Sequence, residues 1–70
     1  MTANVKYGAL AKEYLGTKLP LTVLRSAAGY YLGTIDDEGP ASRESVEYWP
    51  SEKMANAAMN DGEWTQRDHP

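Results

Sequence analysis

Apolar residues recur at helical spacing between residues 51 and 62, which predicts an amphipathic helix of three turns. Ser51 can cap the amino end of this helix, Glu52 places a favourable negative charge in its first turn, and Gly62 can end it in the left-handed conformation. The apolar side comprises Met54, Ala55, Ala58 and Met59. Because these side chains are small or flexible, the helix can lie close to a sheet while burying little area per residue.

The stretch from residue 19 to residue 49 has the composition of β-strands. Two runs, 30–35 and 42–49, are rich in aromatic and β-branched residues, and the polar residues 36–40 between them predict a hairpin loop. A further strand over 19–26 is joined to the first run by the short turn 27–29. The pattern therefore predicts a small α+β fold, in which a three- or four-stranded antiparallel meander carries one main helix packed on one face.

Alternation along residues 42–49 divides this strand into two faces. Val46 and Tyr48 are the expected core pair, so Glu47 and Trp49 are expected on the open face of the sheet, together with either Tyr30 or Tyr31 depending on the register. Aromatic rings with a polar end and arginines are common at protein interfaces. The candidate partner-binding residues are Tyr30, Tyr31, Arg43, Glu47 and Trp49. The alternative is that the N-terminal residues fold back and cover this face.

The two ends of the chain are less regular. Residues 1–18 form either an irregular arm or a short helix, with Leu10 and Tyr14 on one side of it. Residues 63–67 can return as a short edge strand, anchored by Trp64 because an indole buries much apolar area. The whole chain, residues 1–70, is expected to form a single small domain.

The length of 70 residues limits the chain to one modest core. It has no cysteine for a disulfide, and its single histidine, His69, is too few ligands for a zinc site. We therefore expect no metal and no cofactor, and self-association as a homodimer is the support that remains. No apolar run approaches the roughly 20 residues that span a bilayer, and no signal peptide is recognisable, so the chain is expected to be cytoplasmic with no membrane partner.

Charge is distributed unevenly along the chain. Residues 1–35 carry four cations and one acid, a balance of +3, whereas residues 36–70 carry three cations and nine acids, a balance of −6. The acidic half disfavours nucleic acid as a partner. It suits an alternative function, that of an acidic inhibitor of a host nucleic-acid-binding defence protein. A second alternative is a single-stranded nucleic-acid binder that stacks bases on Tyr30, Tyr31 and Trp49. That alternative needs the N-terminal cations, Lys6, Lys12, Lys18 and Arg25, around the same face.

The string Ser42-Arg43-Glu44-Ser45 is the most suggestive one for chemistry. A nucleophilic serine needs a base within hydrogen-bond reach, and no histidine lies near these serines in the sequence. Arg43 is expected to pair with an acid across strands. The acids of residues 36–38 lack the spacing of a calcium loop. We therefore expect no catalytic residues and no enzymatic activity.

Several short motifs resemble a known group of proteins. They are GYYLGT at residues 29–34, SRES at 42–45, Tyr48, and GEWTQR at 62–67. As a set they resemble an uncharacterised family of short proteins from proteobacteria and their phages and plasmids. The resemblance covers about residues 29 to 67. It implies a bacterial or mobile-element setting and no particular mechanism.

Taken with the charge and the aromatic residues, these patterns predict a small protein-interaction module or regulator. It is expected to bind a protein partner, or a second copy of itself, through the open sheet face or an exposed strand edge.

Overall fold

The computed structural model describes residues 6–69 and contains two helices and three strands. In chain order these elements are α1 (Ala9–Leu15), β1 (Thr22–Ser26), β2 (Gly29–Asp36), β3 (Gly39–Arg43) and α2 (Glu52–Asp61). The strands form one antiparallel sheet in the order β1-β2-β3. The α+β fold with a small antiparallel meander, expected from the sequence, is confirmed.

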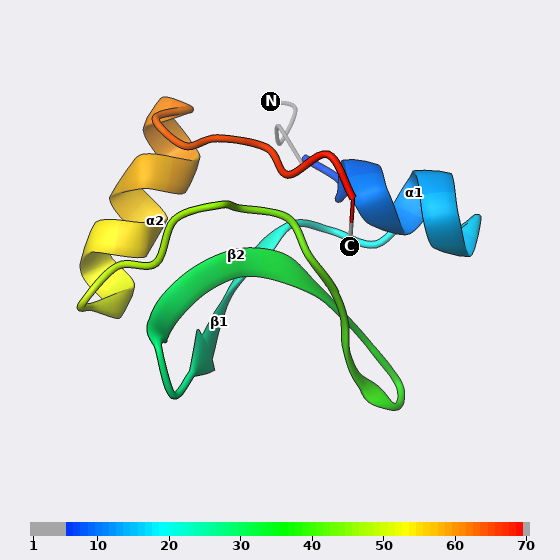
Figure 1. Cartoon of the computed structure of the whole chain (residues 1–70), viewed down its shortest axis with the longest axis horizontal. Helices are drawn as coiled ribbons and strands as arrows, with labels where there is room; N and C mark the ends of the chain where they lie inside the picture. The colour runs from blue at the N-terminus through cyan, green and yellow to red at the C-terminus, as the bar shows by residue number, and fades with distance from the viewer. Residues whose placement is uncertain (1–5, 70) are drawn as a thin grey trace, which may run out of the picture.

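Strand β2 is strongly arched, and both helices lie on its convex side (Figure 1). Thr34 points to this side, since it lies against Gly8 at the start of α1, and Leu32, two residues earlier in the strand, points the same way. Both side chains are fully buried. Because side chains alternate along a strand, Tyr31, Gly33 and Ile35 point to the concave side. Within residues 6–69 no helix covers the concave side. We call the surface formed there by Leu24, Tyr31, Ile35, Arg43 and Tyr48 the concave face.

The turn between β1 and β2 is only two residues long and is held by Ser26. The Ser26 hydroxyl donates to the carbonyl of Gly29 at 3.1 Å and accepts from the N–H of Ala28 at 3.2 Å. Gly29 has a φ of 130°, a conformation that L-residues rarely adopt. A β-carbon at this position would also lie 2.9 Å from the carbonyl oxygen of Trp49. Position 29 therefore requires glycine for two independent reasons.

Helix α2 begins directly after Ser51, whose hydroxyl accepts the N–H of Met54 at 3.2 Å, and Gly62 ends it with a φ of 69°. Only two of the four apolar residues expected to face the sheet, Ala55 and Ala58, are buried. Met54 is 50% exposed. The small alanines let the helix approach the sheet closely, as their size predicts.

Residues 42–49 do not form one continuous strand, because the third strand contains a large irregularity. Arg43 is paired with Gly33 and Trp49 with Tyr30, so six steps of the chain lie opposite three steps of β2. The three extra residues lie within residues 44–48, which we call the looped-out segment, and they interrupt the alternation of side chains. The prediction that Val46 and Tyr48 form a core pair is therefore wrong: they are 48% and 37% exposed.

The two ends of the described chain pack on the helix side of the sheet. Residues 63–67 form no regular strand; a single bridge joins Gln66 to Ser45, in the looped-out segment. Trp64 is half-buried. Near the other end, Leu10 of α1 is buried and Tyr14 is exposed. Residues 6–18 thus lie away from the concave face, and the rest of the predicted arm, residues 1–5, lies outside the described residues.

Candidate functional site

Glu44 is a fully buried carboxylate at which three segments of the chain meet. Its Oε1 accepts hydrogen bonds from the backbone N–H of Leu10 at 3.0 Å and the side-chain amide of Gln66 at 2.7 Å. Its Oε2 accepts from the backbone N–H of Ala11 at 3.1 Å and the hydroxyl of Ser42 at 2.6 Å. The carboxylate thereby joins α1, the end of β3 and residues 63–69, which we call the C-terminal segment.

These bonds explain both the charge of Glu44 and the start of α1. Burial works against the ionised carboxylate, but the hydrogen bonds from Leu10, Ser42, Gln66 and Ala11 outweigh it and hold the pKa of Glu44 below its ordinary value of 4.5. The N-cap residue of α1, Gly8, has no side chain to accept the first N–H groups of the helix, and Glu44 takes that role from a distant part of the sequence. Glu44 is therefore an internal cap that fixes α1 to the sheet.

The concave face contains three side chains in direct contact. The rings of Tyr31 and Tyr48 meet edge to face, with centroids 5.8 Å apart and an interplanar angle of 68°. The guanidinium carbon of Arg43 lies 4.3 Å from the centroid of the Tyr48 ring. Two hydrogen bonds fix this guanidinium further, from Nε to the carbonyl of Ser45 at 3.1 Å and from Nη2 to that of Val46 at 2.9 Å.

The predicted pairing of Arg43 with an acid across strands is wrong. Its hydrogen bonds go to two neutral carbonyls because the looped-out segment turns these groups toward it, and no carboxylate within residues 6–69 pairs with it. A stacked, oriented guanidinium without a counter-ion can bind a carboxylate of another molecule. The adjacent rings and Ile35, which is 49% exposed, supply apolar area around it.

The structure separates the five candidate residues predicted from the sequence. Tyr31 and Arg43 lie together on the concave face. Tyr30 and Trp49, by contrast, are paired through their backbones and point to the convex side, so the prediction that Trp49 lies on the open face is wrong. Its place is taken by Tyr48, because the looped-out residues shift the alternation by an odd number. No signal in the sequence marks this loop.

Glu47 is also absent from the concave face, where the sequence pattern placed it. Its carboxylate accepts the N–H of Thr65 at 2.9 Å and so ties the looped-out segment to the C-terminal segment. Partial burial works against ionisation, but hydrogen bonds from Thr65 hold the pKa of Glu47 below its ordinary value. Glu47 therefore stabilises the loop that presents Tyr48.

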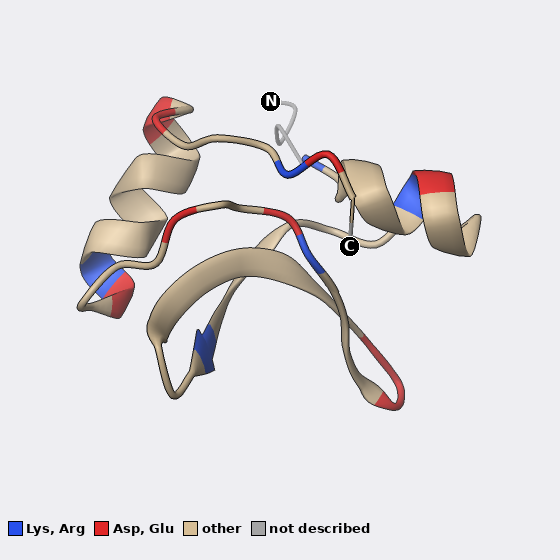
Figure 2. Ribbon diagram, in the orientation of Figure 1, with Lys and Arg blue, Asp and Glu red and all other residues tan. Residues whose placement is uncertain are grey.

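The cations of the N-terminal half do not gather around one aromatic surface. The ammonium of Lys18 lies 5.7 Å from the ring centroid of Tyr7, and the guanidinium of Arg25 lies 5.7 Å from that of Tyr30. Figure 2 shows basic residues on β1, on both helices and near the C-terminal end. The cluster of stacking rings and cations that a single-stranded nucleic acid would need is not assembled by residues 6–69.

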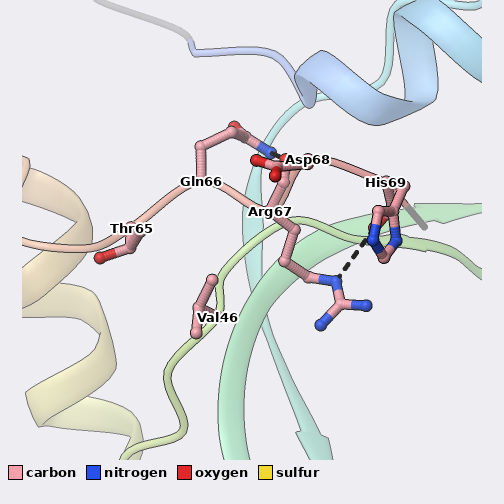
Figure 3. A pocket seen from close by; sticks show the side chains of 6 residues that line it. All are labelled: Val46, Thr65, Gln66, Arg67, Asp68 and His69. Atoms are coloured by element: carbon pink, nitrogen blue, oxygen red, sulfur yellow. Dashed lines mark hydrogen bonds between the residues drawn. The ribbon is translucent and has the colours of Figure 1, made fainter.

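A shallow pocket of about 260 Å³ lies between the looped-out segment and the C-terminal segment (Figure 3). Its lining residues are Val46, Thr65, Gln66, Arg67, Asp68 and His69. Arg67 donates from Nε to the carbonyl of His69 at 3.3 Å within the same segment. This volume lies below the range of roughly 300–1,000 Å³ that is typical of small-molecule sites. Within residues 6–69 no group of three or more His, Cys, Asp or Glu residues could hold a metal ion.

The hydroxyls of the SRES motif are hydrogen-bonded within the fold. Ser42 donates to Glu44 and contacts the hydroxyl of Thr34 at 2.6 Å, while Ser45 donates to the carbonyl of Glu47 at 2.9 Å and accepts the N–H of Leu32 at 3.0 Å.

Neither described helix is long and apolar enough to cross a membrane. Comparison with known proteins gives no match to any family model, curated protein or solved structure.

Proposed function

We propose that this chain is a small protein-interaction module that binds a protein partner through its concave face. The observation that carries the proposal is the guanidinium of Arg43, which is stacked on Tyr48 and pairs with no carboxylate of residues 6–69. Tyrosine and arginine are, with tryptophan, the side chains that most often contribute strongly to protein interfaces.

Rigidity supports the same function. Tyr31 is 9% exposed and lies over Gly33, where a β-carbon would be 3.1 Å from its ring. Arg43 is fixed by two hydrogen bonds, and Glu47 holds the loop that carries Tyr48. Because these side chains are already ordered, little conformational entropy remains to be lost on binding.

The chemistry of the surface defines its partner. A guanidinium surrounded by aromatic rings favours a partner that presents an exposed carboxylate next to an apolar side chain. A second copy of the chain is one possible source of such groups.

Affinity capture with matched variants tests this function. The wild-type chain, Tyr48→Ser and Tyr14→Ser are used as baits in bacterial lysate, and captured proteins are identified by mass spectrometry. Tyr14 is the control because it is also exposed, at 51%, but lies on α1 on the opposite side of the sheet. We expect one protein to be retained by the wild type and Tyr14→Ser and lost with Tyr48→Ser.

The captured protein is then purified and its affinity for the three chains is measured by calorimetry. Light scattering over a concentration series shows whether the partner is a second copy. Equal retention by all three baits, or no partner and a monomer at every concentration, contradicts the proposed function. Circular dichroism of each variant establishes that the substitution leaves the fold intact.

A further inference from the structure

Strand β1 is at the edge of the sheet, and the hydrogen bonds of β2 reveal which of its backbone groups are unused. The N–H and C=O of Tyr30 both bond to Trp49, at 2.9 and 2.7 Å. The carbonyl of Leu32 likewise accepts bonds from the third-strand side, at 2.8 and 3.0 Å. Tyr30 and Leu32 therefore direct their backbone groups away from β1.

The residues of β1 opposite these two are Arg25 and Val23. In an antiparallel ladder, paired residues direct their backbone groups either toward each other or both away. Arg25 and Val23 must therefore point their N–H and C=O groups outward. Leu21, two residues before Val23, follows the same alternation: its N–H points outward and bonds to the carbonyl of Lys6 at 2.7 Å. Among residues 6–69, no segment pairs with the outer edge at Val23 and Arg25.

The charge along this edge is of one sign. No acidic residue occurs between Glu13 and Asp36, whereas this stretch contains Lys18 and Arg25. Arg25 is exposed, on the convex side of β1, beside the ring of Tyr30. In Figure 2 no acidic colour lies on β1 or on the turn that joins it to β2; acidic colour lies at the β2–β3 turn, on the stretch after β3 and at the start of α2. The charged residue of β1 is thus a cation, Arg25, in a chain whose net charge is −3.

We propose that an extended acidic segment of the partner protein adds to β1 as an antiparallel fourth strand. Its backbone bonds to the outward groups of Val23 and Arg25. The residue opposite Arg25 is acidic and lies on the convex side, and its neighbour opposite Leu24 is apolar and extends the concave face. The recognised pattern is therefore an alternation of acidic and apolar residues.

A second copy of the chain fits this edge less well. Pairing of two β1 strands about a two-fold axis through Leu24 would place the two Arg25 side chains at diagonal positions on one face, where like charges repel. Strand β1 itself contains no acid to offset them. The charge pattern thus favours a different, acidic protein.

The inference rests on the proposed function, since it names the chemistry of the partner, but it can fail separately because Val23 and Arg25 are not part of the concave face. The test is an NMR titration of the ¹⁵N-labelled full chain with the acetylated, amidated peptide Thr-Glu-Val-Glu-Val-Glu-Thr. The same peptide with lysine in place of each glutamate is the charge control. Expected are shifts of the Val23 and Arg25 amides, slower hydrogen exchange at both, and roughly tenfold weaker binding of the lysine peptide.

Two variants separate the contributions of charge and backbone. Arg25→Glu is expected to reverse the preference between the two peptides. Val23→Pro removes one outward N–H without removing a bond to β2, and is expected to weaken both peptides equally. Tyr48→Ser, on the concave face, is expected to leave peptide binding within about twofold of wild type. Thermal melts of each variant confirm that it is folded.

Several results would overturn the inference. One is equal affinity for the two peptides, and another is shifts confined to residues outside β1. A third is a wild-type dimer that Val23→Pro converts to a monomer, because a second copy would then occupy the edge. Binding of oligothymidylate at these amides, with no binding of the glutamate peptide, would assign the edge to nucleic acid instead. Loss of a captured partner with Tyr48→Ser but not with Arg25→Glu would uphold the concave face and reject the edge.

Discussion

Replacing Glu44 by glutamine removes the charge at the centre of the fold while keeping the size of the side chain. Glutamine has one oxygen and one NH₂ group in place of two oxygens. If the NH₂ group takes the position of Oε2, Ser42 can rotate to accept from it, but the N–H of Ala11 loses its acceptor. If it takes the position of Oε1, both Leu10 and Gln66 lose theirs. In either orientation at least one buried donor is left facing another donor.

The magnitude follows from these lost bonds. An unsatisfied buried donor costs about 1–3 kcal/mol, and the surviving bonds weaken because they are no longer charge-assisted. We therefore expect Glu44→Gln to lower the free energy of unfolding by about 2–4 kcal/mol. A domain of this length has roughly 4–10 kcal/mol in total. The variant should still fold, but with a large share of its stability lost.

Urea unfolding followed by tryptophan fluorescence measures this change, and hydrogen exchange locates it. Exchange should accelerate most at the N–H groups of Leu10 and Ala11, which Glu44 caps. Glu63→Gln is the control, because Glu63 is exposed and its substitution should change stability by less than about 0.5 kcal/mol. If Glu44→Gln changed stability no more than this control, Glu44 would not be the group that fixes α1 to the sheet.

Three further predictions follow from the same contacts. Because the pKa values of Glu44 and Glu47 are lowered in the folded chain, the unfolded chain takes up more protons in acid. The contribution of these two carboxylates to the free energy of unfolding should thus be fully present above about pH 5 and be lost as the pH falls through their folded pKa values. The free energy of unfolding of Glu44→Gln should fall less steeply with decreasing pH, and an equal dependence on pH in the wild type and the variant would contradict this. Gly8→Ala should cost about 1–3 kcal/mol in urea unfolding, because its β-carbon overlaps the side chains of Glu44 and Thr34; an unchanged free energy of unfolding would show that these side chains can move aside. Ser51→Ala should cost about 1 kcal/mol and speed exchange at the start of α2; unchanged exchange would show that the cap contributes nothing.

The elements of this fold that the sequence predicts best are those determined by local interactions. The cap at Ser51 and the stop at Gly62 define α2 because both act within one helical turn. The short turn after Ser26 and the polar stretch before Gly39 give the meander in the same way. Each of these signals depends on residues at most a few positions apart, so a short stretch of sequence is enough to predict the element.

The candidate site was predicted less well because it depends on distant contacts. The looped-out residues exist because Glu44 turns inward to cap α1, more than 30 residues away, and because residues 65–67 pair with them. Neither interaction leaves a mark in the alternation of residues 42–49. The strand pattern consequently exchanged Tyr48 and Trp49. Arg43, which precedes the loop, was assigned to the open face, and the choice between Tyr30 and Tyr31 stayed open in the sequence; the contact with Tyr48 places Tyr31 there.

The measurement that tests the central claim most directly is site-specific photo-crosslinking in cells that produce the chain. A benzophenone amino acid is placed at position 48 in one chain and at position 14 in another, and adducts are resolved by mass. The claim that the concave face binds a protein partner predicts a discrete adduct from position 48 and none from position 14. An absence of adducts at position 48, or the same adduct from both positions, would contradict it.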